Sequence, residues 1–124
     1  ADYMNILSFL VPKPRLHREA FDAYYGRLPN RIEVSWFRDG HFIIGEVEAG
    51  EQKFRTQGKN ADDFIEMVND AIIRLNDVPE EYINTLRFSR TYTPSVEERA
   101  KLEDATVESA KIFAQKDKRA LQLA

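Results

Sequence analysis

The chain has 124 residues, of which 43% are hydrophobic and 31% charged, and its formal net charge is -3. This length fits one domain with a single core, and the mildly acidic balance gives no overall attraction to nucleic acid or anionic membranes. Cysteine is absent, which excludes disulfides, thiolate metal sites and thiol catalysis. The longest apolar runs fall far short of the roughly 20 residues of a membrane span, so we expect no membrane association and a cytoplasmic location.

Residues 1–30 are expected to form an N-terminal extension made of a strand and a helix. Asn5 to Val11 are apolar enough for a short strand, which two following prolines terminate because proline lacks an amide donor. Leu16 to Tyr25 then show helical spacing, with Gly26 as the predicted stop.

The clearest strand signal is Arg31 to Arg38, where apolar and polar residues alternate strictly. Asp39-Gly40 follows, a pair typical of a two-residue hairpin turn. Such a turn fixes how the two strands pair. The predicted pairs are Trp36 with Ile43, Val34 with Gly45, and Ile32 with Val47.

This pairing puts apolar residues on both faces of the predicted sheet. One face is expected to form the core, and it carries Ile32, Val34, Trp36, Ile43 and Val47. The other face is polar except near the turn, where Phe37, Phe42 and Ile44 gather. One helix on the core face leaves these three uncovered, so we expect a protein partner or a second copy of the chain to cover them.

A third strand and a helix complete the predicted core. Ala49-Gly50 leads into a strand at Gln52 to Thr56, and a tight turn and a bulged three-residue loop both remain open because alanine disfavours positive φ. Asn60 then caps a helix from Ala61 to Asn76 that opens with an acidic turn. Its apolar stripe is the predicted contact with the sheet and consists of Phe64, Ile65, Val68, Ala71, Ile72 and Leu75.

The C-terminal part is predicted to hold a fourth strand and a long helix. Val78 to Tyr82 resembles a helical turn begun by proline, and Leu86 to Tyr92 has strand character. Ser95 and Glu98 match a capping box, which predicts a helix of about 20 residues. Ile112 and Phe113 lie on its apolar stripe, and we expect them to join the protein interface.

Together these elements predict one α+β domain, a small antiparallel meander of three to four strands packed on one amphipathic helix. Its parts are the extension at residues 1–30, the core at 31–92, and the C-terminal helix and tail at 93–124.

Few residues offer catalytic chemistry. His17 and His41 belong to no metal-binding pattern, and no serine lies in a nucleophile motif. Asp39, Glu46 and Glu48 could contribute to a metal-dependent nuclease site, but turn and strand positions already account for them. The prediction is therefore a protein without enzymatic activity, cofactor or metal.

Four basic residues are candidates for nucleic-acid contact. Arg87 and Arg90 lie on the predicted fourth strand, and Lys118 and Arg119 lie in the tail. Acidic residues are interspersed and the net charge is negative, so a solvated face is the better interpretation. Nucleic-acid contact remains an open alternative.

The order of motifs between residues 31 and 76 resembles the HicB antitoxin and HicB-like superfamily. The shared motifs are the hairpin Asp39-Gly40-His41-Phe42, the segment Thr56-Gln57-Gly58 and the capped helix that follows directly. The helix positions that match are Asp62, Asp63, Asn69, Ala71 and Ile72. Where the family usually has Pro-x-Leu-Pro-Gly, this chain has Glu48-Ala49-Gly50-Glu51-Gln52.

The resemblance implies a degenerate ribonuclease-H-like module that lacks the catalytic carboxylates and acts by binding. In the family the partner is a small basic RNA-cleaving toxin, to which an acidic domain is electrostatically complementary. We therefore expect an antitoxin-like binding domain that forms a homo-oligomer, and the uncovered patch favours a dimer. One alternative is a stand-alone structural or regulatory module whose termini fold over that patch. A metal-dependent nuclease is the other alternative.

Overall fold

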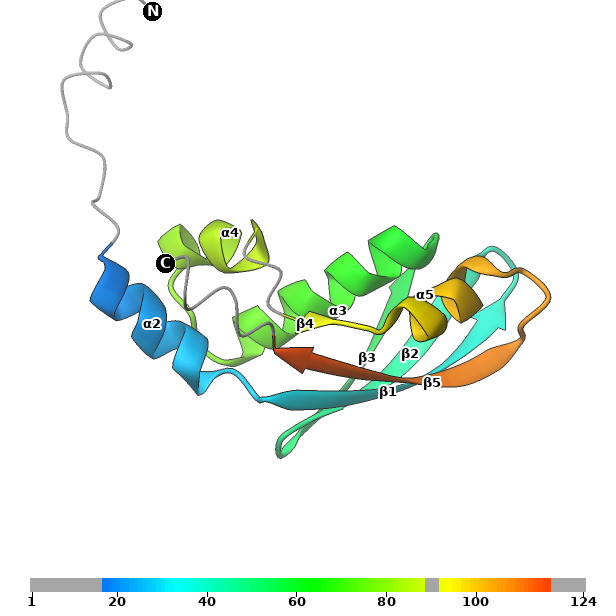
Figure 1. Ribbon diagram of the computed structural model, residues 1–124, viewed down its shortest axis with the longest axis horizontal. Coiled ribbons are helices and arrows are strands. Elements are labelled where there is room, and N and C mark those ends of the chain that lie inside the picture. Colours follow the sequence, from blue (N-terminus) through cyan, green and yellow to red (C-terminus); the bar gives the residue numbers. More distant parts are fainter. Residues whose placement is uncertain (1–16, 89–91, 117–124) are drawn as a thin grey trace, which may run out of the picture.

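The computed structural model describes residues 17–88 and 92–116, which form an α+β fold. A five-stranded antiparallel sheet of order β3-β2-β1-β5-β4 carries its helices on one face (Figure 1). The strands are β1 (Arg31–Asp39), β2 (Phe42–Ala49), β3 (Gln52–Gly58), β4 (Tyr92–Thr93) and β5 (Ser109–Lys116). The helices are α2 (Arg18–Arg27), α3 (Ala61–Leu75), α4 (Glu80–Phe88) and α5 (Val96–Glu103).

The β1–β2 hairpin forms as predicted, but its register was predicted wrongly by two residues. Asp39 pairs with Phe42, so the loop is Gly40-His41 rather than Asp39-Gly40. Gly40 has a φ of 59°, which fits a type II′ turn, where only the first central residue needs positive φ. A type I′ turn would have required positive φ at a second, non-glycine residue as well.

A shift of two residues leaves every side chain on its predicted face, because side chains alternate with a period of two. The observed pairs are Trp36 with Gly45, Val34 with Val47, and Ile32 with Ala49. The predicted core face is therefore confirmed, and Ala49 joins it with 1% exposure.

The β2–β3 turn has the same form. Ala49 pairs with Gln52, and Gly50 between them has a φ of 64°. The tight turn thus occurs and the bulged loop does not, with the loop at Gly50-Glu51, one residue later than Ala49-Gly50.

Helix α3 lies where the sequence predicts it. The Asn60 side chain accepts a hydrogen bond of 2.8 Å from the amide of Asp63, and the Asp63 carboxylate in turn accepts one of 2.8 Å from the amide of Lys59. Phe64 is fully buried over Gly45, where an added Cβ would come within 2.5 Å of the Phe64 ring. The helix packs closely on β2 because glycine leaves room for this ring.

The predicted fourth strand at Leu86 to Tyr92 is wrong over its described first part. Helix α4 runs through Leu86 to Phe88, and β4 contains only Tyr92 and Thr93. Ile83 and Leu86 are buried in the core. Acidic residues in the first turn of α4 and apolar residues at helical spacing favour a helix here.

The predicted long C-terminal helix is also wrong. Ser95 caps α5 as expected, accepting a hydrogen bond of 3.1 Å from the amide of Glu98. The helix ends at Glu103, however, and the Asp104 side chain accepts a bond of 2.9 Å from the amide of Thr106, a local turn that diverts the chain. The Thr106 hydroxyl donates a second bond of 2.7 Å to the same carboxylate, and the hydroxyl and amide bonds together lower the pKa of Asp104.

After this turn, β5 enters the sheet between β1 and β4. The side chain of Arg38 holds this connection in place. Its guanidinium donates to the carbonyls of Leu102 at 2.6 Å, Asp104 at 2.8 Å and Val107 at 2.7 Å. Arg38 thus supplies donors to carbonyls at the end of α5 and in the following loop, although the Asp104 carbonyl also accepts a hydrogen bond of 3.0 Å from the amide of Val107.

Helix α2 confirms the expected N-terminal helix, although it continues past Gly26 to Arg27. Phe21 and Tyr25 are buried in the common core. The Lys116 ammonium donates to the carbonyls of Tyr25 and Leu28, at 3.1 Å each, and joins β5 to the end of α2. Burial lowers the pKa of Lys116. The predicted strand at Asn5 to Val11 lies outside the described residues.

Candidate functional site

The sheet face opposite the helices is the candidate site, and we call it the open face. Along each strand, alternate side chains point to this face, and none of those on the four longer strands is buried. They are Arg31, Glu33, Ser35, Phe37 and Asp39 on β1, Phe42, Ile44, Glu46 and Glu48 on β2, Lys53, Arg55 and Gln57 on β3, and Ser109, Lys111, Phe113 and Gln115 on β5.

One end of the open face is apolar. Phe37 pairs with Ile44 across β1 and β2, and Phe42 lies beside them at the turn. Phe37 and Phe42 are each 40% exposed, whereas Trp36, on the helical side of the same strand, is 2% exposed. The register therefore places this apolar patch as the sequence predicts.

The described parts of the two terminal segments that the alternative hypothesis folds over this patch pack elsewhere. Phe21 of α2 and Leu102 of α5 are buried in the core on the helical side of the sheet. The C-terminal segment expected as a helix instead adds β5 to the sheet. Within residues 17–88 and 92–116, the open face thus lacks the cover that a folded-back module would have.

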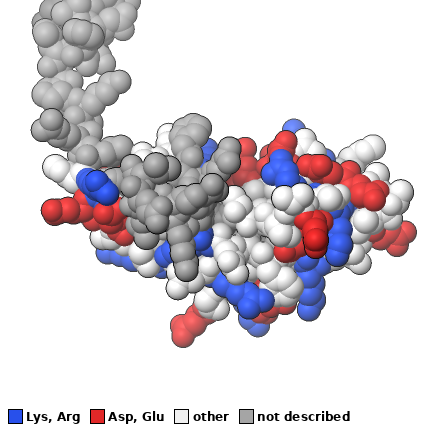
Figure 2. All heavy atoms as spheres, viewed as in Figure 1, with Lys and Arg blue, Asp and Glu red and all other residues white. Residues whose placement is uncertain are grey.

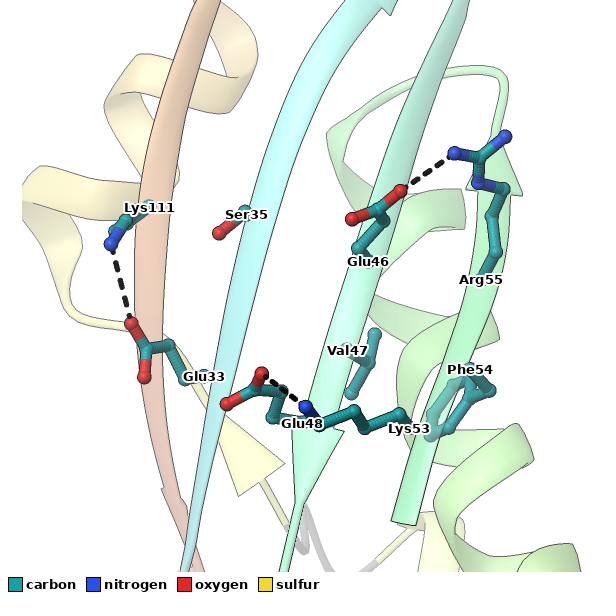
Figure 3. A pocket seen from close by; sticks show the side chains of 9 residues that line it. All are labelled: Glu33, Ser35, Glu46, Val47, Glu48, Lys53, Phe54, Arg55 and Lys111. Atoms are coloured by element: carbon teal, nitrogen blue, oxygen red, sulfur yellow. Dashed lines mark hydrogen bonds and ion pairs between the residues drawn. The ribbon is translucent and has the colours of Figure 1, made fainter.

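The other end of the open face is charged. Three ion pairs connect neighbouring strands there (Figure 3). They are Glu46 with Arg55 at 2.6 Å, Glu48 with Lys53 at 3.4 Å, and Glu33 with Lys111 at 3.6 Å. Because these side chains are largely exposed, the pairs contribute little to folding stability, and their charges remain available to a ligand.

A hollow of about 460 Å³ lies within this charged end. Ser35 lines it between the longer side chains of Glu46 and Lys111 (Figure 3). The three ion pairs supply the rest of its polar lining. The hollow is therefore a polar depression, surrounded by charges of both signs.

Ile112 and Phe113 separate to opposite faces of the sheet. Ile112 is 3% exposed and pairs with Val34 in the core, so its prediction as an interface residue is wrong. Phe113 is 39% exposed on the open face, and the Arg31 guanidinium lies 4.6 Å from its ring centroid. The two residues shared a stripe only under the helical interpretation.

Arg87 is on helix α4 and not on a strand. Its guanidinium forms an ion pair with Asp70 of α3 and lies 3.8 Å from the carboxylate of Glu66. Two carboxylates thus compensate its charge within the helical layer. Arg90, Lys118 and Arg119 lie outside the described residues.

Among the described residues, histidine, aspartate and glutamate form no group of three that could hold a metal ion. Of the three carboxylates considered for a nuclease site, Glu46 pairs with Arg55 and Glu48 with Lys53, whereas Asp39 lies opposite Phe42 at the hairpin turn. None of the helices in this part of the chain combines the length and apolar character required to cross a bilayer.

The sequence prediction missed the cations of the open face as a group. Lys53 and Arg55 could have been found by extending the hairpin register from β2 to β3. Lys111 could not, because its segment was interpreted as a helix.

Acidic and basic side chains are interspersed over the face shown in Figure 2. The local order of charges therefore matters more for binding than the overall charge.

Comparison of the chain with protein-family models, curated proteins and solved structures finds no match.

Proposed function

We propose that this chain is a non-enzymatic binding protein that holds a protein partner on its open face. The observation that carries the proposal is the exposure of three aromatic residues there, 40% for Phe37 and Phe42 and 39% for Phe113. Exposed aromatic side chains are costly to leave in water and are enriched at protein interfaces.

The open face is also a rigid platform. Its side chains are carried by strands whose neighbours pair over most of their length, and its reverse side is the core. A surface fixed in this way loses little conformational freedom on binding, which favours a role in recognition.

The resemblance to HicB-like proteins suggests the class of partner, a small basic RNA-cleaving toxin. The net charge of -3 and the carboxylates at the centre of the open face suit a basic partner. Complementary charge speeds encounter and disfavours other partners. Pairing of Glu46 and Glu48 with cations favours binding over a metal-ligand or general-base role.

A direct test combines the purified chain with a small basic ribonuclease-like protein encoded beside its gene. Calorimetry should show binding, and RNA cleavage by the ribonuclease should stop when the chain is in excess. The variant Phe37→Thr/Phe42→Thr should weaken binding roughly 10-fold or more, since buried aromatic anchors dominate interface energies.

The matched control is Met67→Gln, which removes an apolar side chain of similar exposure, 43%, from helix α3. This variant should bind like the wild type. Failure of the neighbouring ribonuclease to bind would refute the toxin partner. If the double phenylalanine variant bound the ribonuclease with the affinity of the wild type, the open face would be refuted as the contact surface.

A further inference from the structure

The charges of the open face are ordered by strand. At its charged end, cations lie on β3, as Lys53 and Arg55, and on β5, as Lys111. Between them β2 and β1 carry the carboxylates Glu46, Glu48 and Glu33. Arg31, also on β1, lies beyond these residues at the strand end, over the Phe113 ring. Taken strand by strand over the rows Arg55-Glu46-Ser35-Lys111 and Lys53-Glu48-Glu33-Phe113, the charge is positive on β3, negative on β2 and β1, and positive on β5 (Figure 3).

We propose that this pattern excludes a second copy of the chain as the occupant of the open face. It selects instead a different protein whose contact surface has a basic centre between acidic flanks. The inference rests on the proposed function, in that it takes the open face to be a protein-binding surface, and it specifies the chemistry of the partner.

The exclusion of a second copy follows from symmetry. Two identical sheets that stack face to face with aligned strands are related by a two-fold axis between them, either along the strands or across them. With the axis along the strands, β3 of one copy lies over β5 of the other and β2 lies over β1. Residues that are paired with one another across the sheet in one copy stay level with the same set of residues in the other copy. Arg55 of one copy then faces Lys111 of the other, and Glu48 faces Glu33.

With the axis across the strands, each strand lies over its own counterpart. Cationic β3 then faces cationic β3, with Arg55 over Lys53, and Glu46 of β2 faces Glu48. Both full overlaps bring like charges together as water is removed, which is unfavourable.

Overlap restricted to the apolar end avoids this repulsion but is small. Phe37, Phe42 and Ile44 are already partly covered by their own sheet, and a specific interface needs about 800 Å² from each partner. Three such side chains supply far less. A stable complex must therefore extend over the charged rows.

A partner with the inverse charge pattern forms attractive charge contacts at the positions where a second copy would meet like charges. Its basic centre would meet Glu33, Glu46 and Glu48 around the hollow at Ser35, and its acidic flanks would meet the cations of β3 and β5. Each ion pair within the chain is then joined by a charge of the right sign from the partner. The apolar end would be covered in the same contact.

A charge-inverted version of this chain supplies the probe. It carries Glu33→Lys, Glu46→Lys, Glu48→Lys, Lys53→Glu, Arg55→Glu and Lys111→Glu, which reverses all three ion pairs and leaves the net charge unchanged. Its open face then carries the opposite charge at each of these six positions on the same strands. Circular dichroism checks its fold, and should it be unfolded, the four β2 and β3 substitutions alone provide the probe.

Light scattering after size-exclusion chromatography should show that neither the wild type nor the probe self-associates through the open face. A mixture of the two should form a heterodimer. The mixed complex should be roughly 10-fold or more tighter than either self-association and should weaken as salt screens the charges. Phe37→Thr in both chains should weaken it further. A variant with Arg18→Asp and Asp22→Arg, an ion pair reversed on helix α2, should not associate with the wild type.

Two results would overturn the inference. One is a mixture of wild type and probe that stays monomeric. The other is a wild-type homodimer that Phe37→Thr dissociates. A mixed dimer combined with no binding of the neighbouring ribonuclease would instead retain the charge pattern and reject the toxin partner, so the two proposals fail separately.

Discussion

The two faces of the sheet use the same strands for different purposes. On the helical face, Trp36, Ile43 and Val47 are buried at 2% exposure or less. On the open face, Phe37 and Phe42 alternate with such residues along the same strands yet keep 40% of their surface exposed. Because the buried side chains are on the helical face, substitutions there should lower the stability of the fold. The exposed aromatic side chains are on the open face, so substitutions there should affect binding instead.

The largest expected effect is on the helical face, at Phe64. The Phe64→Ala substitution empties a fully buried site between α3 and β2 and should lower the free energy of unfolding by about 3–5 kcal/mol. Chemical denaturation with guanidinium measures this loss. A loss below about 1 kcal/mol, typical of exposed positions, would contradict the central place of Phe64 in the core.

The next effect is expected at Gly45, directly beneath Phe64. An alanine Cβ would come within 2.5 Å of the ring and 3.1 Å of Val34 Cγ1, so Gly45→Ala should destabilise the fold by about 1–3 kcal/mol. In a Phe64→Ala background the same change should cost much less, because the ring is gone. Equal costs in the two backgrounds, measured by a double-mutant cycle, would exclude this contact as the cause.

A comparable or smaller effect is expected at Arg38. The variant Arg38→Met keeps the aliphatic stem but removes the donors to the carbonyls of Leu102, Asp104 and Val107. The Asp104 carbonyl keeps its bond from the Val107 amide, but loss of the donor to the partly buried carbonyls of Leu102 and Val107 should cost about 1–3 kcal/mol. Hydrogen exchange should show faster opening of α5 and β5 than of the β1–β3 hairpins, and uniform acceleration would disprove a local role.

The smallest effect on stability is expected on the open face. Phe37→Thr retains strand propensity and lies on the face opposite the core, but it loses the cross-strand contact with Ile44, so the free energy of unfolding should fall by no more than about 1 kcal/mol. The same substitution should weaken binding of the partner, though less than the double variant Phe37→Thr/Phe42→Thr. Strong destabilisation in denaturant titration would show that Phe37 serves the fold and would erase the contrast between the faces.

Much of this contrast was visible in the sequence because it depends on local patterns. Alternation from Arg31 to Arg38 assigned Trp36 to the core and Phe37 to the other face, and the two-residue error in register did not disturb that assignment. The predicted α+β class and the helix after Asn60 are likewise confirmed. The apolar patch at the turn followed from the same reasoning.

The charged end of the open face could not be predicted in full. Glu33 and Phe113 become neighbours only because β5 pairs with β1, a contact between segments far apart in the chain. In Ser109 to Lys116 few residues are strongly apolar, so helical and strand periodicities fit them almost equally well.

The sequence by itself thus determined the two hairpins, the helix α3 and which side chains share a face. These features arise from turn chemistry, capping and periodicity among residues close in the chain. Only the tertiary structure decided that the C-terminal segment is strand β5 and that Ile112 is core. The physical reason is that β1 offers an unpaired row of backbone donors and acceptors, and pairing these with β5 while burying Ile112 and Ala114 outweighs a weak helical preference.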